Sequence, residues 1–304
     1  MLKIFKSKRA LTVFGICVLA ASLVFAVLRT ISLLFFFEPE IGYYTAGAPL
    51  PVIMNILLVI AVLACAALTF IPAVGVSPVE GRENVYTRAV SALIALGFLS
   101  FSVHYIISLA QYSGIYAEIP PSYLLCAVAS VLSCVFFAVK ALNKDSLAAP
   151  YVICGIFVVL WFALVLAECY FNAFVQMNAP NKTIFLFACL SAILLAVNEM
   201  RIPLGRTKRA FHMFSAALAS VLLPFSAIPS TICYFTGNMP LNYTLISYDA
   251  IILLLSFLAI SRTVQMCFGT EAKISEQVEE PAEQPESEAD IDTQQDTTED
   301  PQED

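Results

Sequence analysis

Four ionisable side chains lie inside otherwise apolar stretches of the sequence, where a charge is costly and often marks a functional site. They are Arg29, His104, Glu168 and Asp249. Arg29 has the chemistry to pair with Glu168 or Asp249, beside a histidine able to take up a proton. Together they would form an outward-facing polar vestibule for a small solute or ligand. The alternative is a structural salt bridge, with Arg29 reaching toward the membrane surface and His104 hydrogen-bonded.

Their distance from the nearest membrane edge separates the four candidates. At a rise of 1.5 Å per residue through an apolar core about 30 Å thick, all four fall in its outer half. Asp249 precedes Arg262 by thirteen positions, which puts it about 10 Å below the outer edge and deepest of the four. We therefore expect Asp249 to carry any transport or sensing.

Other intramembrane chemistries lack their residues. The chain has no His-Glu-x-x-His and no Cys-x-x-Cys, and its two histidines, His104 and His212, belong to opposite membrane edges. Tyr248-Asp249 supplies only one of the two carboxylates that an aspartyl protease needs. The nine cysteines are expected to be small packing residues. The sequence predicts no enzyme, no metal site and no cofactor.

These side chains must be held by membrane-spanning helices. The 304 residues are 60% hydrophobic and 13% charged, far from the balance of a water-soluble domain. A spanning helix needs about 20 apolar residues. Eight stretches qualify, and they predict an all-α bundle of eight transmembrane helices: 10–36, 51–73, 89–110, 122–142, 151–173, 182–198, 212–235 and 243–261. Pro224 and Pro229 fall inside the seventh, where neighbouring helices can satisfy a freed carbonyl.

The charged residues divide the chain into two parts. Residues 1–270 hold 15 Lys/Arg and 9 Asp/Glu, a net charge of +6, whereas 271–304 hold 14 Asp/Glu and one Lys, a net charge of −13. Fourteen of the 16 basic residues fall on one side of the predicted bundle, which makes both termini cytoplasmic. One cytoplasmic loop is especially basic and is expected to attract anionic lipid, through Arg201, Arg206, Lys208 and Arg209.

The sequence therefore predicts an eight-helix domain over 1–269 and a disordered acidic cytoplasmic tail over 270–304. The tail either keeps the chain soluble or docks on a basic protein partner, or folds back on the basic loop. A nucleic-acid partner has no support beyond charge. The bilayer itself is the one partner that composition requires.

The bundle also carries signs of an internal duplication. Residues 63–102 align without gaps with 187–226, and ten of the forty positions are identical. Chance in so biased a composition gives roughly four. Two parallel four-helix repeats, roughly 1–142 and 150–262, are expected. Ser91 with Ala95, and the equivalent Ser215 with Ala219, put small residues four apart, so the third and seventh helices should pack centrally.

Three further segments carry a resemblance to known sequences. They are Gln176-Met177-Asn178-Ala179-Pro180-Asn181-Lys182, Glu199-Met200-Arg201 with Gly205-Arg206, and Phe37-Glu38-Pro39-Glu40-Ile41-Gly42-Tyr43-Tyr44. The first two are similar to the Met-Asn-x-Pro-x-Lys and acidic-x-Arg segments of a set of uncharacterised bacterial multi-pass membrane proteins, and the third is similar to their first outer loop. The resemblance implies an eight-span protein of the bacterial plasma membrane. It implies no activity and no site residue.

Two classes of function fit these features. The first is a membrane-embedded interaction, scaffold or sensory protein, in which the buried polar groups pack against one another without a continuous cavity. The second is a small-solute transporter or ligand-binding receptor, with an outward cavity lined by the four candidate residues. The first is favoured, because the spans lack the midplane charge pairs and broken helices of many transporters.

Overall fold

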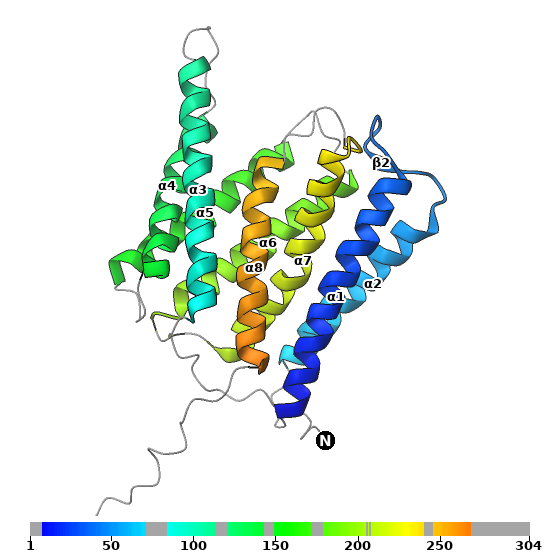
Figure 1. Cartoon of the computed structure of the whole chain (residues 1–304), viewed down its shortest axis with the longest axis horizontal. Helices are drawn as coiled ribbons and strands as arrows, with labels where there is room; N and C mark the ends of the chain where they lie inside the picture. Colours follow the sequence, from blue (N-terminus) through cyan, green and yellow to red (C-terminus); the bar gives the residue numbers. More distant parts are fainter. Residues whose placement is uncertain are drawn as a thin grey trace, which may run out of the picture. The chain divides into compact units, whose positions relative to one another are not determined.

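The computed structural model describes residues 8–70, 84–112, 121–142, 149–171, 179–204, 206, 208–239 and 246–268. Within these ranges the chain forms eight long helices, each long and apolar enough to cross a membrane. The prediction of an all-α polytopic bundle is confirmed. The helices are α1 Lys8–Phe35, α2 Pro49–Phe70, α3 Val85–Tyr112, α4 Pro121–Leu142, α5 Ala149–Phe171, α6 Pro180–Arg201, α7 Arg209–Phe235 and α8 Ile246–Phe268 (Figure 1).

Proline defines several helix starts. Pro49, Pro121 and Pro180 are the first residues of α2, α4 and α6. The first turn of a helix has no internal partner for its N–H groups, so a residue without an N–H costs nothing there.

The last helix differs most from its prediction. It continues to Phe268, seven residues past the predicted end, and so includes Arg262.

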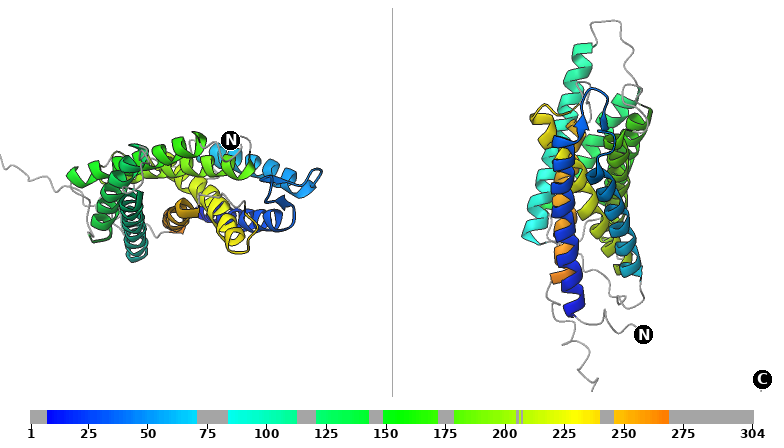
Figure 2. Two further views of the ribbon diagram at one scale, coloured as in Figure 1. Left: turned by 90° about the horizontal axis from the view of Figure 1, so that it is seen from above. Right: turned by 90° about the vertical axis from the view of Figure 1, so that its right-hand side faces the viewer.

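The helix α7 lies at the centre of the bundle. It packs against α1, α2, α6 and α8, and 83% of its span is buried, against 17% for α2. Seen along the helices, α7 runs from the row formed by α5 and α6 toward α1 and α8 on the opposite side (Figure 2). The central position predicted for the seventh helix is thus observed.

The third helix does not share that position. It packs on α4 and α8, with 44% of its span buried. Its Ser91 and Ala95 are buried, as are Ser215 and Ala219 of α7. The α3–α4 pairing matches α7–α8, but α6 packs closely on α7 whereas the described parts of α2 and α3 make no comparable contact. The small residues of α3 and α7 therefore lie at helix contacts, as predicted, but only α7 is central in the bundle.

A short hairpin links α1 to α2. Strands β1 (Phe37–Glu38) and β2 (Tyr43–Tyr44) pair antiparallel, with Phe37 opposite Tyr44 and Glu38 opposite Tyr43. Gly42, at φ 74°, closes the turn in the left-handed region that favours glycine. We call the side of the bundle that carries this hairpin the hairpin end, and the side where α1 begins and α8 ends the terminal end.

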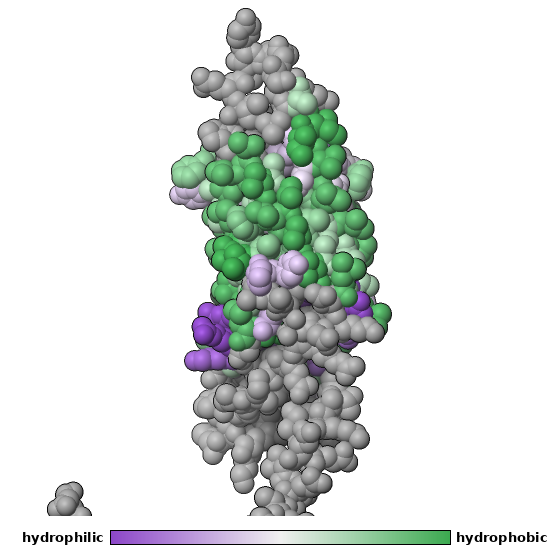
Figure 3. All heavy atoms as spheres, turned by 90° about the vertical axis from the view of Figure 1, so that its left-hand side faces the viewer, coloured by the Kyte–Doolittle hydropathy of each residue, from purple (hydrophilic) through white to green (hydrophobic). Residues whose placement is uncertain are grey.

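The outer surface of the bundle is broadly apolar. Leu23, Leu63 and Leu96 are among the many large hydrophobic side chains that remain exposed, at 69%, 63% and 60%. One face shows a continuous apolar band, with hydrophilic residues gathered near its lower edge (Figure 3). Such a surface is unfavourable in water and favourable in hydrocarbon. The protein is therefore embedded in a membrane.

Residues 270–304 lie outside the described residues, as do 176–178 of the motif that carries the resemblance. The acidic tail remains a prediction.

Candidate functional site

Arg29 is fully buried on α1, and its partners are uncharged. Its guanidinium donates hydrogen bonds to the main-chain carbonyls of Phe225 and of Ser226 (3.1 Å) on α7, and to Asn181 Oδ1 on α6 at 2.9 Å. It also lies over the Phe225 ring, 5.1 Å from the centroid. Arg29 therefore pairs with neither Glu168 nor Asp249, and ties α1 to α7 and α6.

The sequence explains why a carbonyl of α7 is available to Arg29. In an α-helix the carbonyl of Phe225 would accept from the N–H of residue 229, but residue 229 is proline and has no N–H. The freed carbonyl sits in an apolar surrounding, where an unsatisfied acceptor is costly. A charged donor from α1 satisfies it, so Arg29 and Pro229 depend on each other.

Tyr44 of the hairpin lies against the same guanidinium. Its hydroxyl is buried and, like Arg29 Nε, has no hydrogen-bond partner among the described residues. Burial raises the pKa of the Tyr44 hydroxyl above its ordinary value of 10.0, and the nearby positive charge of Arg29 opposes that rise only in part. The hydroxyl therefore stays protonated at neutral pH. The Tyr44 oxygen can also accept a hydrogen bond, and the guanidinium beside it is a donor.

Glu168 belongs to a different group, formed with residues of α8 and α3. Its carboxylate, half-buried on α5, accepts a hydrogen bond from the Tyr248 hydroxyl of α8 at 2.7 Å. The Tyr248 and Tyr105 hydroxyls, from α8 and α3, lie 3.0 Å apart. Trp161 packs on Tyr248 with ring centroids 5.8 Å apart. The Glu168 carboxylate of α5 is thus linked through Tyr248 of α8 to Tyr105 of α3.

Asp249 is fully buried in the first turn of α8. Its charge acts on the thiols of Cys169 and Cys189, and the charge of Lys182 acts on Cys169 as well. Lys182, in the first turn of α6, is itself 1% exposed. The sequence predicts no role for Lys182, although it is the first residue of the predicted helix 182–198.

His104 is exposed on the surface of α3, next to the inward-facing Tyr105. The four candidates therefore do not line one vestibule. Arg29 joins α1 to α7 and His104 faces outward, whereas Glu168 and Asp249 both act on the Cys169 thiol.

A third group of charges, at the terminal end, was missed by sequence reasoning. Glu199 of α6 accepts from Arg262 of α8 through both carboxylate oxygens, each at 2.8 Å, and from Lys140 of α4. All three side chains are at most 5% exposed. The fully buried His212 of α7 acts electrostatically on Glu199. The sequence did contain a signal for this group, because Glu199 is an acidic residue near a helix end on the side where basic residues predominate.

The residues of the predicted basic loop lie beside this group. Arg201 ends α6, Arg206 and Lys208 follow, and Arg209 begins α7. The side chains of Arg201, Arg206 and Lys208 are exposed. The loop therefore offers charge at the surface, whereas Lys140 and Arg262, two of the fourteen basic residues assigned to the same side, are buried in the bundle.

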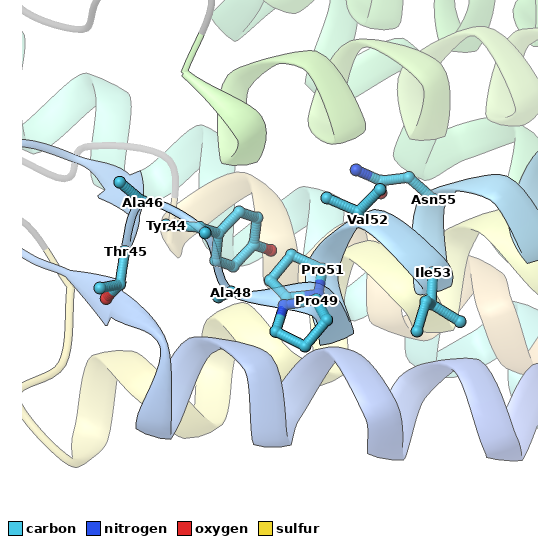
Figure 4. A pocket seen from close by; sticks show the side chains of 10 residues that line it. Tyr44, Thr45, Ala46, Ala48, Pro49, Pro51, Val52, Ile53 and Asn55 are labelled. Atoms are coloured by element: carbon cyan, nitrogen blue, oxygen red, sulfur yellow. The ribbon is translucent and has the colours of Figure 1, made fainter.

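One groove opens at the hairpin end, between β2 and the start of α2. Its volume is about 480 Å³, and Figure 4 shows the Tyr44 ring reaching toward Pro51 on α2. None of the four predicted site residues lines it. The lining residues are Tyr44, Thr45, Ala46, Gly47, Ala48, Pro49, Pro51, Val52, Ile53 and Asn55.

Within the described ranges, no three His, Cys, Asp or Glu side chains are grouped so as to hold a metal ion. Comparison with models of known families, with curated proteins and with solved structures found no match.

Proposed function

We propose that the protein is a membrane-embedded interaction or sensory protein, and that it moves no solute through its helix bundle. One observation carries this proposal: the buried charges with known partners are satisfied inside the bundle. Arg29 is held by carbonyls of α7, Glu168 by Tyr248, and Glu199 by Arg262 and Lys140. A transport path would instead leave such groups facing a common water-filled space.

The proposal includes a location and an orientation. We place the protein in a bacterial plasma membrane with both termini in the cytoplasm, so the terminal end is the inner one. The bias of basic residues supports this, since Arg201, Arg206 and Lys208 are exposed at that end. The acidic tail would then lie in the cytoplasm and be available to a protein partner. The two four-helix repeats and the resemblance to bacterial eight-span proteins remain part of the proposal.

Enzymatic activity is not part of it. Glu199 lies in a different group from Glu168 and Asp249, whose charges both act on the Cys169 thiol. A ligand-binding receptor is the second candidate. The observation that favours it is the groove beside Tyr44, which opens at the proposed outer face.

Hydroxyl-radical footprinting of the protein in nanodiscs tests the absence of a path. Trp161 and Tyr248 are buried beside Glu168, at 0% and 6% exposed, whereas Tyr86 and Tyr234 are 53% and 44% exposed near the two ends of the bundle. We expect oxidation of Tyr86 and Tyr234 and protection of Trp161 and Tyr248. Oxidation of Trp161 at a rate close to that of Tyr234 would overturn the proposal, because it requires water in the bundle.

A further inference from the structure

The positive charge of Arg29 has no negative partner among the described residues. Its three acceptors are two main-chain carbonyls and one amide oxygen, and its Nε has none. A buried charge is normally neutralised by an opposite charge, because hydrogen bonds to neutral groups compensate lost hydration only in part. The guanidinium of Arg29 thus has hydrogen-bond acceptors inside the bundle, whereas its positive charge can still attract an anion.

Tyr44 connects the groove at the hairpin end to Arg29. Tyr44 lines the groove, and its covered hydroxyl faces the guanidinium. The strand that holds Tyr44 is two residues long and pairs with only two residues of β1. Little main-chain structure therefore resists a shift of Tyr44 by a bound ligand, which would give the ligand access to the Tyr44 hydroxyl and to Arg29 next to it.

The other residues that line the groove indicate the chemistry of the rest of the ligand. Pro49, Pro51, Val52 and Ile53 are apolar, with Thr45 and Asn55 as the polar side chains near the opening. A volume of about 480 Å³ is within the usual range for small-molecule sites, which are mostly apolar with a few placed polar groups. The groove therefore suits an apolar body that carries one charged head.

We propose that this groove binds an amphiphilic anion, with its apolar body against Pro51 and Val52 and its negative head directed to Tyr44 and Arg29. This proposal rests on the sensory role proposed above, because sensing would be the reason for binding such a ligand. The binding itself can be measured separately. The head group can come from a soluble carboxylate or from an anionic lipid, since both offer oxygen acceptors with a negative charge.

Equilibrium dialysis of labelled octanoate against the full chain in phosphatidylcholine nanodiscs tests the site, with empty nanodiscs giving the partition background. We expect saturable binding of octanoate and at least tenfold weaker binding of 1-octanol and octylamine, which share the body and lack the negative head. Tyr44→Phe should weaken octanoate binding about tenfold, the usual effect of one hydrogen bond to a charged group.

A pair of matched variants keeps the test independent of Arg29, whose replacement can disturb folding. Val52→Trp fills the groove, whereas Ile56→Trp adds the same bulk one turn further along α2, outside the groove; the two positions are 58% and 55% exposed. Only Val52→Trp should abolish saturable binding. Equal binding of 1-octanol, unchanged binding in Val52→Trp, or no saturable binding to the wild type would each overturn the proposal.

Nanodiscs that contain phosphatidylglycerol distinguish the two sources. Competition with octanoate would identify a lipid head group as the anion, and unchanged octanoate binding would identify a soluble carboxylate; either result supports the site. The footprinting test of the bundle does not involve the groove, so failure of one proposal is distinguishable from failure of the other.

Discussion

At the scale of single residues, the Arg29–Pro229 pairing relates two features that are each unfavourable alone. A proline inside a membrane helix leaves a carbonyl unsatisfied, and an arginine in the membrane is costly without partners. Arg29 donates to the carbonyl of Phe225, which Pro229 leaves free, and each feature compensates the other. The function of this charge is therefore structural before it is anything else.

A double-mutant cycle tests that pairing. Arg29→Gln should lower the free energy of unfolding by about 3 kcal/mol, since it removes hydrogen bonds from a charged donor. In a Pro229→Ala background residue 229 again has an N–H for the Phe225 carbonyl, so Arg29→Gln should cost about 1 kcal/mol less. Reversible unfolding in mixed micelles provides the measurement. Strictly additive effects would show that the two residues do not depend on each other.

At the scale of helices, the charges of Glu199, Arg262 and Lys140 hold α6, α8 and α4 together at the terminal end. Removing one member of a buried ion pair leaves its partners uncompensated.

Glu199→Gln should therefore destabilise the bundle by about 3–5 kcal/mol, because two buried cations lose the carboxylate that pairs with both of them. Glu38→Gln, the same change on an exposed hairpin residue, is the control and should be near neutral. Thermal unfolding in detergent measures both. If the two variants unfold alike, the network does not hold the helices.

Close approach of α1 and α8 provides a second prediction for helix packing. A Cβ on Gly15 would lie 2.6 Å from Cys267 Cβ, next to the main chain, whereas a Cβ on Gly97 would meet the end of the flexible Leu254 side chain at 2.8 Å. Gly15→Ala should cost about 1–3 kcal/mol, and Gly97→Ala less, because Leu254 can turn away. The same unfolding assay compares them, and a larger loss for Gly97→Ala would contradict the packing.

At the scale of the whole molecule, the eight helices were predictable because a membrane imposes their length and composition. The centre of the bundle was predictable only in part. Small residues on α3 and α7 indicate close packing, but not which of the two helices is surrounded.

The partners of the charges were not predictable in the same way. Whether Arg29 meets Glu168 or a carbonyl of α7 depends on how each helix is rotated and tilted, which spacing along one helix does not determine. Arg262 was misplaced for a simpler reason, since it lies within the true length of α8, one residue past the predicted end. The hairpin at 37–44 was read as a loop because its strands have only two residues.

The central claim is that the buried polar groups are packed against one another and away from water. Native cysteines already sit beside these groups: Cys126 near Glu168, Cys169 and Cys189 near Asp249, and Cys233 near Arg29. Maleimides react in water with exposed thiols, so N-ethylmaleimide labelling in nanodiscs, followed by mass spectrometry, tests all three places at once.

An introduced Tyr86→Cys, at an exposed position, is the positive control, and unfolding in SDS shows that every thiol can react. We predict that Tyr86→Cys is labelled in the folded protein and that Cys126, Cys169, Cys189 and Cys233 are labelled only after unfolding. Labelling of Cys169 or Cys189 in the folded protein at a rate near that of Tyr86→Cys would contradict the claim, and would mean that water reaches Asp249.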